Sequence, residues 1–426
     1  MSGPAPHDPY RALREAGFRR YLTGNLIGTV GFQMQGVAVG WELYERTHSA
    51  FALGIVGLVQ VVPIILLFLP VGHLVDRYDR RTVLMLALAG LALAAVGLAA
   101  VSLTRAPVPL FYALLFLSGT ARALLGPAKS ALLPEIVRLE AFQSAVAWNS
   151  GGWQMAEVIG PAIGGALLAA TRSPALVYLT HAALALAFVA LVAGVRTSGE
   201  SRPIVAATLD SLLDGARYVM RTRILLAAIT LDLFAVLFGG AVALLPVYAK
   251  DILHVGPAGL GGLLAAQAIG AVSTTLVLAH LPPLRRAGPA LLRAVTLFGL
   301  AMIAFGLSRH YLLSFLALGV AGSADSVSVV IRMTLSQLGT PNELRGRVSA
   351  VNSLFIGTSN QLGEFESGAV AGLFGPVFSV VAGGIGTLVV VGLVAAAWPE
   401  VRRLGKLEEA TPHPGDPLHS PVQSVP

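Results

Sequence analysis

The ten residues "GHLVDRYDRR", Gly72–Arg81, place two aspartates and three arginines between two long apolar runs. The runs, 51–71 and 82–103, are each long enough to cross a bilayer, since a spanning helix needs about 20 apolar residues. Runs of this kind recur along a chain that is 55% hydrophobic and 12% charged, whereas soluble proteins are about 25% charged. The sequence therefore predicts a polytopic membrane protein in which this charged stretch is a loop.

The apolar runs predict an all-α fold with twelve transmembrane helices in two bundles of six. The expected spans are 20–44, 50–75, 83–103, 108–132, 142–170, 174–195, 224–250, 259–281, 289–308, 311–335, 348–371 and 376–398. A weak repeat supports parallel halves, because "LLPEIVRLEAFQSAV" at 132–146 and "LGTPNELRGRVSAV" at 338–351 both carry Pro, an acid, Arg and then Ser-Ala-Val. Parallel six-helix repeats are a transporter architecture with the substrate site between the halves.

The longest polar connection lies between the sixth and seventh spans and contains one amphipathic segment. Its apolar and charged residues fall on opposite faces of a helix, which suits a helix at the membrane surface or against the bundle. The apolar face holds Leu209, Leu212, Leu213, Ala216 and Met220, and the charged face holds Asp210, Asp214, Arg217 and Arg221. We expect an N-terminal cytoplasmic segment at 1–19, bundles at 20–195 and 224–398, a cytoplasmic linker with this helix at 196–223, and a disordered cytoplasmic tail at 399–426.

The basic residues gather on one side of the expected membrane. The termini and even-numbered loops hold twenty arginines and lysines, and the odd-numbered loops hold five. Because basic loops stay in the cytoplasm, both termini are expected there, in a multi-pass protein of the bacterial inner membrane. The net charge of +7 therefore reflects topology and contact with membrane lipids, and a nucleic-acid partner is not expected. The chain contains no cysteine, so disulfides and cysteine-based metal sites are excluded.

The opening loop carries a spaced motif that resembles one found in the major facilitator superfamily of transporters. Its residues are Gly72, Asp76, Arg77, Arg80 and Arg81. Glycine permits close helix approach, an acid just before a helix N-terminus is favourable, and arginines anchor a loop at the membrane surface. The resemblance implies that the aspartate and arginine latch the cytoplasmic ends of the two halves and release them during transport. The alternative is that the cluster only fixes topology.

One position departs from the family motif: Asp79 stands where the family usually has glycine. Aspartate tolerates left-handed backbone better than most residues, so the turn is expected to survive.

A second motif in the fifth span resembles one carried by exporters and antiporters of the superfamily. It comprises Gly160, Pro161, Gly164 and Gly165, although Ala156 replaces a glycine of the longer pattern. The proline is expected to bend the helix and the glycines to allow close packing. Longer stretches, including "RALLGPAKSALLPEIV" and "AWNSGGWQMAEVIGPAIGG", resemble the branch that contains the bacterial enterobactin (siderophore) exporter and macrolide-efflux-like proteins. The resemblance implies export.

Several ionisable residues fall inside expected spans, where they are costly and by default functional. We expect a charge network for proton coupling from Arg122, Glu157, Asp232, Asp325, Arg332 and Glu364. Asp325 and Arg332 share a helical face but lie two turns apart, so each is expected to find a partner across the cavity. Glu364 is preferred to Glu366, which points elsewhere on the same helix. The alternative is that these residues form structural ion pairs between helices.

Polar stripes on other spans suggest the lining of a substrate cavity. They comprise Asn25, Thr29 and Gln33 on the first helix, Asn149 and Trp153 on the fifth, and Asn360 on the eleventh. Amides and an aromatic ring in one cavity suit an amphipathic or aromatic substrate. His181, alone on an apolar helix, is expected to be a satisfied core residue.

The features together predict a secondary active transporter, a proton antiporter that exports a small amphipathic molecule, siderophore or drug-like. No Walker motif is present and the histidines are scattered, so neither a P-loop ATPase nor a membrane-embedded enzyme is expected. Lipid or lysolipid flipping on the same fold remains the alternative, as does an inactive homologue. We expect a monomer with no cofactor and no metal, whose partners are the substrate, protons and membrane lipids.

Overall fold

The computed structural model describes residues 8–196, 209–239, 241–282 and 285–405. All regular structure in this part of the chain is helical, which confirms the all-α prediction. The short helical turns are η1 (Ala12–Arg14), η2 (Leu139–Ala141), η3 (Ala241–Leu244) and the π-helical η4 (Tyr248–Ile252). The α-helices are α1 (Ala16–Thr47), α2 (Ala50–Arg77), α3 (Arg80–Thr104), α4 (Val108–Ile136), α5 (Phe142–Thr171), α6 (Pro174–Ala193), α7 (Leu209–Arg221), α8 (Arg223–Phe238), α9 (Leu245–Val247), α10 (Gly256–His280), α11 (Ala287–Leu307), α12 (Tyr311–Leu338), α13 (Asn342–Phe374), α14 (Pro376–Ala397) and α15 (Pro399–Arg403).

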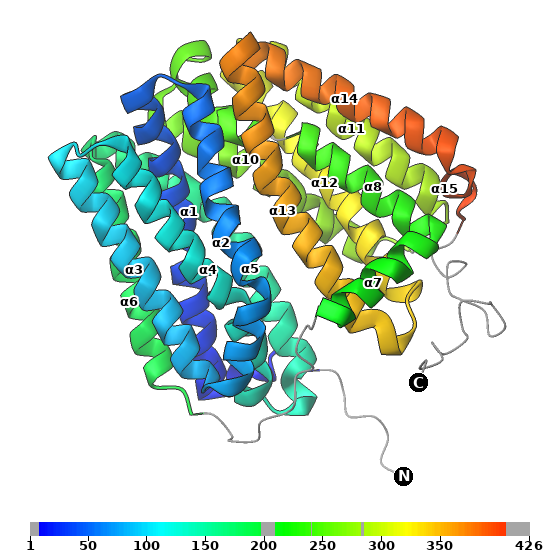
Figure 1. Ribbon diagram of the computed structural model, residues 1–426, viewed down its shortest axis with the longest axis horizontal. Coiled ribbons are helices and arrows are strands. Elements are labelled where there is room, and N and C mark those ends of the chain that lie inside the picture. Colours follow the sequence, from blue (N-terminus) through cyan, green and yellow to red (C-terminus); the bar gives the residue numbers. More distant parts are fainter. Residues whose placement is uncertain (1–7, 197–208, 240, 283–284, 406–426) are drawn as a thin grey trace.

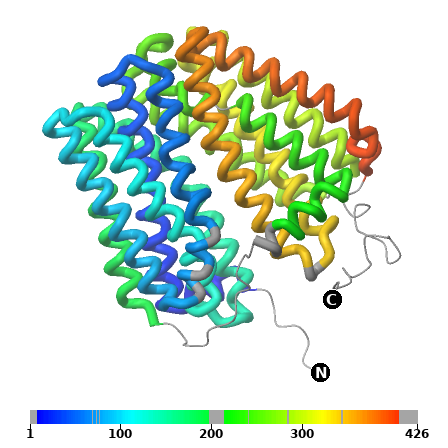
Figure 2. Tube along the Cα trace, in the orientation of Figure 1, coloured from blue at the N-terminus to red at the C-terminus, as the bar shows by residue number. Residues whose placement is uncertain are grey.

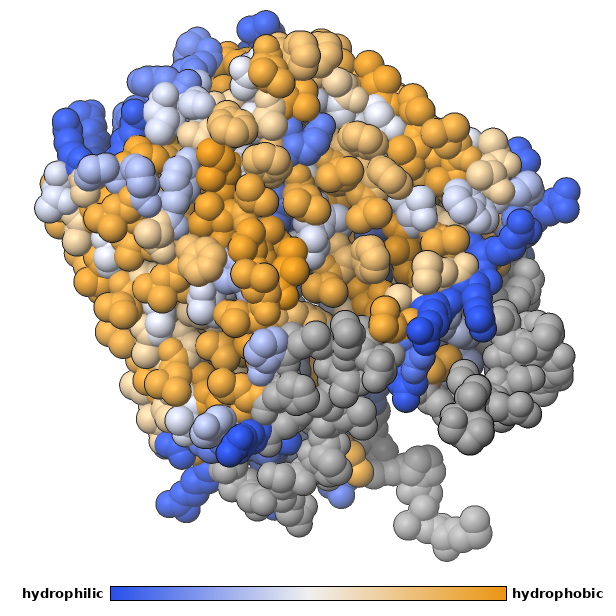
Figure 3. Space-filling view, in the orientation of Figure 1, coloured by the Kyte–Doolittle hydropathy of each residue, from blue (hydrophilic) through white to orange (hydrophobic). Residues whose placement is uncertain are grey.

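The helices are long and apolar enough for a membrane. Nine segments within the described residues could each cross a bilayer by length and hydropathy. α1, α5 and α13 are equally long and lie outside these nine, and they contribute polar side chains to an internal cavity. The prediction of twelve spans is consistent with these helices. Apolar groups cover most of the visible face and hydrophilic groups gather toward its ends (Figure 3), as expected for a protein surrounded by lipid.

The molecule consists of two helical halves that follow one another in the sequence. α1 to α6 form the first half and α8 to α14 the second, side by side in Figure 1. The halves meet along two seams, where α2 packs against α13 and α5 packs against α10. In Figure 2, α2 and α13, far apart in the sequence, run next to each other at this junction.

The seams are closed at one end only. We call the end with the α2–α3 connection and α7 the arginine-rich end, and the end with the α1–α2 and α13–α14 connections the closed end. A Cβ atom placed on Gly54 would lie 3.0 Å from the Cα of Gly368, so the two helices touch near the closed end. A Cβ placed on Gly72 or Gly346, near the arginine-rich end, would meet nothing within 4 Å. The halves therefore diverge toward the arginine-rich end, as Figure 1 shows.

The seventh span is not the continuous helix that the apolar run 224–250 predicts. α8 ends at Phe238 with Gly239 as its C-cap, and the chain continues through η3, α9 and the π-helical η4. The span itself is confirmed, because Arg223–Ile252 is long and apolar enough to cross a bilayer. It is interrupted because glycine destabilises a helix interior and Pro246, in the first turn of α9, favours a new helix start. Residues of the interrupted segment, Gly239, Val242, Ala243 and Pro246, line the cavity between the halves.

The connecting segments pack at the arginine-rich end. α7, inside the expected linker, lies against α13, where Arg347 donates to Asp214 at 2.9 Å. Tyr218 Oη donates to the carbonyl of Gly339 at 2.6 Å. The tail expected to be disordered begins with the short helix α15, and its residues 406–426 lie outside the described residues, as do 197–208 of the linker.

Candidate functional site

A cavity of about 480 Å³ lies between the two halves. Its walls come from α1, α2, α4 and α5 of the first half and from α8, η3, α9 and α10 to α13 of the second. Its polar lining consists of six carboxamides, three carboxylates and one guanidinium, with Phe32 and Phe298 among the apolar members. The polar lining residues are Gln33, Gln35, Gln60, Arg122, Glu157, Gln267, Asp325, Asn360, Gln361 and Glu364.

The structure brings part of the sequence-predicted site together. Four residues of the expected charge network line the cavity: Arg122, Glu157, Asp325 and Glu364. Gln33 and Asn360 of the expected substrate set line it as well.

The other expected substrate residues are not among those that line the cavity. Asn25 donates to Asn149 Oδ1 at 2.8 Å and so ties α1 to α5, and Thr29 donates to the carbonyl of Asn25 at 2.7 Å. Trp153 is 51% exposed.

Arg122 is held by an aromatic ring and an amide. Its guanidinium carbon lies 4.5 Å from the centroid of the Phe32 ring, and Nη1 donates to Gln60 Oε1 at 3.1 Å. Cation–π contact of this kind stabilises a partly desolvated charge. No carboxylate among the described residues lies within ion-pair distance of Arg122, but Glu364 of the other half is close enough to interact electrostatically.

Glu364 lies where the two halves touch. A Cβ placed on Gly57 of α2 would lie 3.0 Å from its Oε2 atom, so glycine makes room for this carboxylate. Glu366 instead lies beside Ser367, which donates to it at 3.4 Å, and it is absent from the cavity lining. The orientation of the two side chains follows the helical geometry that favoured Glu364.

A second charge cluster lies in the second half. Asp232 of α8 forms an ion pair with Arg332 of α12, and both side chains are buried. Arg332 Nε also donates to Ser328 Oγ at 3.2 Å. The expectation that Arg332 finds its partner across the cavity was wrong, because α8 packs against α12 within the same half. Asp325, two turns away, lines the cavity and lies within electrostatic range of Arg332.

His181 is buried and satisfied, as expected. Its Nδ1 lies 2.7 Å from Gln35 Oε1, and its ring meets that of Phe32 edge to face. Since Gln35 and Phe32 both line the cavity, His181 positions two of its residues from behind.

Sequence reasoning missed most of the cavity glutamines. Gln35 and Gln361 adjoin the predicted residues Gln33 and Asn360, whereas Gln60 and Gln267 are isolated in apolar stretches. A glutamine isolated in a spanning helix is itself a signal, since its amide needs a partner in an apolar environment.

Two arginines of the loop motif contact the first half, to which the motif itself belongs. Arg80 pairs with Glu135 of α4 at 2.6 Å, and Arg81 donates to the carbonyl of Ala193. The position of Gly72 is open, so it does not support a close helix contact here. Asp76 belongs to the last turn of α2 rather than preceding a helix start.

Asp79, the departure from the family motif, is the N-cap of α3. The turn survives, as expected, but the φ of Asp79, −56°, is not left-handed, so the tolerance of aspartate for that conformation is not needed. Its carboxylate accepts from Thr82 N at 3.0 Å and from Thr82 Oγ1 at 2.6 Å. Partial burial alone would raise the pKa of Asp79, but these hydrogen bonds and nearby Arg81 lower it below its usual value.

The glycines of the fifth-span motif provide the close contacts of α5. Cβ atoms on Gly160 and Gly164 would lie 2.5 Å from Gln33 Cβ and 2.7 Å from Met34 Cα of α1. A Cβ on Gly165 would lie 2.5 Å from the carbonyl oxygen of Pro257, in α10 of the other half. The motif therefore packs α5 within its own half and also forms part of the seam.

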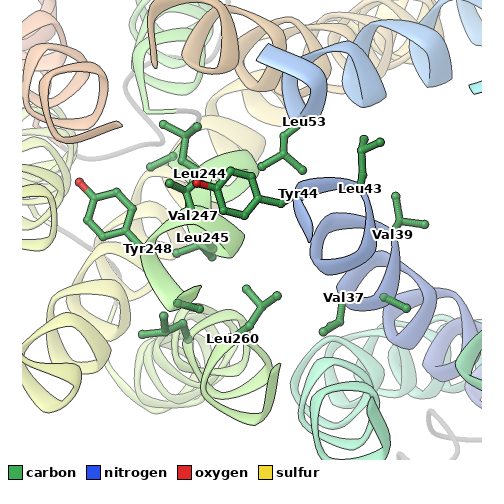
Figure 4. Packing of buried hydrophobic residues seen from close by; sticks show 14 of the residues in the cluster. Val37, Val39, Leu43, Tyr44, Leu53, Leu244, Leu245, Val247, Tyr248 and Leu260 are labelled. Atoms are coloured by element: carbon green, nitrogen blue, oxygen red, sulfur yellow. The ribbon is translucent and has the colours of Figure 1, made fainter. Parts of the chain in front are cut away.

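The closed end is sealed by apolar packing and by polar contacts between the halves. Tyr44 reaches from α1 to the segment that carries Leu244 and Val247 (Figure 4), and its hydroxyl donates to Asp251 of η4. Beside it, Lys250 Nζ lies 3.6 Å from Glu45 Oε1. These contacts must separate before the cavity can open at this end.

The chain resembles known transporters over almost its whole length. A family model described as a transmembrane secretion effector matches residues 7–424. The enterobactin exporter EntS of Shigella flexneri is 28% identical over 393 residues, which cover 91% of this chain and 92% of that protein. The same exporter from Escherichia coli O157:H7 gives the same identity and coverage.

Solved transporters share the fold at low sequence identity. A peptide transporter of the POT type superposes with a TM-score of 0.73 at 13% identity, covering 94% of this chain and 100% of that chain. An inward-facing bacterial homologue of the lysosomal transporter Spinster gives 0.70 at 15% identity, over 93% and 99% of the two chains. The fold, the cavity between the halves and the family match agree. The chain therefore belongs to the transmembrane secretion effector family of the major facilitator superfamily and is a secondary transporter, not an enzyme.

Proposed function

We propose that the protein exports a small amphipathic organic molecule across the bacterial inner membrane by proton-coupled alternating access. The observation that carries this proposal is the cavity between the halves, whose wall combines six amides, three carboxylates and two aromatic rings. Such a wall can hold a ring or alkyl part and hydrogen-bond its polar groups. The relatives named as enterobactin exporters make a siderophore one candidate cargo.

The direction of the opening supports binding from the cytoplasm. Basic connections favour the cytoplasmic side, so the arginine-rich end faces inward and both termini are cytoplasmic. The open positions of Gly72 and Gly346 lie at this end. The conformation is thus inward-facing, ready to take cargo from the cytoplasm.

Transport then requires the two ends to exchange states. The arginine-rich end closes over the cargo, bringing the loop motif of α2 and α3 to the second half. The contacts at the closed end part, including the Gly165–α10 seam and the Tyr44–Asp251 hydrogen bond. Release on the far side follows, and the return step resets the carrier.

Proton coupling is assigned to carboxylates in the middle of the membrane. Asp325 and Glu157 line the cavity near the centres of α12 and α5, and Glu364 faces Arg122 across the seam. A carboxylate in this environment changes its proton affinity when its hydration or its partner changes. Asp325 is our first choice for the coupling residue, because it is central and has no ion-pair partner among the described residues.

A whole-cell export assay tests this function. Cells that lack their own exporters and produce the protein are loaded with a panel of siderophores and drug-like compounds. We expect at least one compound to accumulate less than in cells without the protein, and an uncoupler that removes the proton gradient to abolish the difference. Unchanged accumulation for every compound, with the protein present in the membrane, would contradict export; higher accumulation would indicate uptake.

A further inference from the structure

The cavity wall holds more negative than positive groups. Three carboxylates, Glu157, Asp325 and Glu364, line it together with one cation, Arg122. Arg122 lies within electrostatic range of Glu364 and donates to Gln60. Its charge is therefore already balanced by one of the three carboxylates.

The charges behind the wall do not remove this excess. Asp232 and Arg332 form an ion pair and neutralise each other. Lys129 lies two turns along α4 from Arg122, outside the cavity lining, with its Nζ 5.6 Å from the Phe188 ring centroid. Counting Lys129 still leaves four acids against three bases in this region. His181 shares a hydrogen bond with Gln35 and adds no acidic group.

Glu157 and Asp325 are the two cavity carboxylates whose charge is not offset by a cation of their own. Glu157 has no basic residue within electrostatic range among the described residues, and Asp325 has only Arg332, which is already paired with Asp232. Neither has an ion pair or a hydrogen bond with another described residue, although each sits near the middle of its helix. An unpaired carboxylate at this depth is costly unless a positive charge or a proton neutralises it.

An unsatisfied acceptor adds to the negative potential of the wall. Gln361 Oε1 is buried without a hydrogen-bond partner in the described part of the chain, and Gln361 lines the cavity. A buried acceptor in this state favours a ligand that brings positive charge or a donor.

We propose that the cargo is an organic cation, such as an amphiphile with a protonated amine, whose charge is taken by Glu157 and Asp325. This inference rests on the proposed transport function and narrows its substrate class. The cation and the proton compete for the same carboxylates: cargo binding from the cytoplasm displaces a proton inward, and proton uptake from outside displaces the cargo outward. Competition of the cation and the proton for the same carboxylates is sufficient to couple their movements in opposite directions.

A pair of ions with the same shape and opposite charge tests the proposal. Purified full-length protein in micelles is dialysed against radiolabelled tetraphenylphosphonium or tetraphenylborate, and binding to protein-free micelles is subtracted. We expect saturable binding of the phosphonium with an affinity at least about tenfold higher than that of the borate. Glu157→Gln and Asp325→Asn should each weaken phosphonium binding about tenfold. Glu366→Gln, the same change on α13 outside the lining, should not.

The comparison on the unchanged protein does not depend on how the variants fold. Equal or tighter binding of tetraphenylborate, or no saturable binding of either ion, would overturn the proposal. So would unchanged phosphonium affinity in both cavity variants when their elution profiles are normal. If the protein fails this binding test but exports a neutral or anionic compound in the cell assay, it is an exporter of another substrate class. Failure of both assays would contradict the proposed transport function itself.

Discussion

Replacing one glycine at the seam should shift the transporter away from the proposed inward-facing state. In Gly165→Ala, the added Cβ would lie 2.5 Å from the carbonyl oxygen of Pro257 and 2.9 Å from the Cα of Gly261. Comfortable carbon contacts need about 3.5 Å, so α5 and α10 must move apart by about 1 Å. Both obstructing atoms belong to the main chain, which cannot turn aside as a side chain can.

The size of the shift follows from the cost of overpacking. Adding a methyl group to a tight core costs about 1–3 kcal/mol. The seam at the closed end parts in the outward-facing state, so this cost falls on the inward-facing state alone. Since 1.4 kcal/mol is a factor of ten, the ratio of outward- to inward-facing molecules should rise about 5- to 150-fold.

Spin-label distances can measure this shift directly. The chain has no cysteine, so a pair of labelled cysteines can be introduced on either end without background. We expect Gly165→Ala to lengthen distances across the closed end and shorten those across the arginine-rich end. Gly392→Ala is the matched control, because a Cβ on Gly392 meets nothing within 4 Å. Distance distributions identical to those of the unchanged protein would refute the reasoning.

Three further substitutions test separate parts of the account. Gly72→Val should insert and fold normally, because the Cβ position of Gly72 is open in this conformation. It should stop transport by preventing the two halves from closing at the arginine-rich end. Normal transport at normal membrane abundance would contradict a role of the loop motif in this closure. Asp232→Asn leaves Arg332 buried without its ion-pair partner and should lower the free energy of unfolding by about 3–5 kcal/mol, measured by thermal unfolding in detergent. The double variant Asp232→Asn/Arg332→Gln should recover much of this loss. A double variant as unstable as the single one would contradict a stabilising ion pair. Asp79→Ala should cost about 1 kcal/mol through loss of the α3 cap. The pKa of Asp79 is lowered in the folded protein, so its contribution to stability is present above the ordinary carboxyl pKa and is lost as the pH falls through the lowered pKa. A stability difference between the unchanged protein and Asp79→Ala that persists below that pH would argue against the cap.

Much of the fold follows from the sequence, because hydropathy and helical periodicity act within one segment. The apolar runs located the helices, and helical geometry chose Glu364 over Glu366 for the cavity. The break after Phe238 was missed because the run 224–250 is long and predominantly apolar, and hydropathy does not register how glycines and a proline divide a helix.

The site was harder to predict, because it depends on which helices meet. The partner of Arg332 is set by the packing of α8 against α12, which no pattern within α12 reveals. The cavity glutamines come from α1, α2, α10 and α13, and they carry no charge that marks them within their own helices. The capping role of Asp79 was not predicted, because it depends on the hydrogen bonds that its carboxylate accepts from Thr82 once α3 starts there.

Proton movement in reconstituted vesicles tests the central claim most directly. Purified protein is placed in liposomes that enclose a pH-sensitive dye, and a compound exported in the cell assay is added. The account predicts that adding the compound on one side drives protons in the opposite direction. Asp325→Asn should abolish this flux while the protein remains folded. Proton flux that persists unchanged in Asp325→Asn would exclude Asp325 as the coupling residue, and transport of the compound without any proton movement would contradict proton-coupled export.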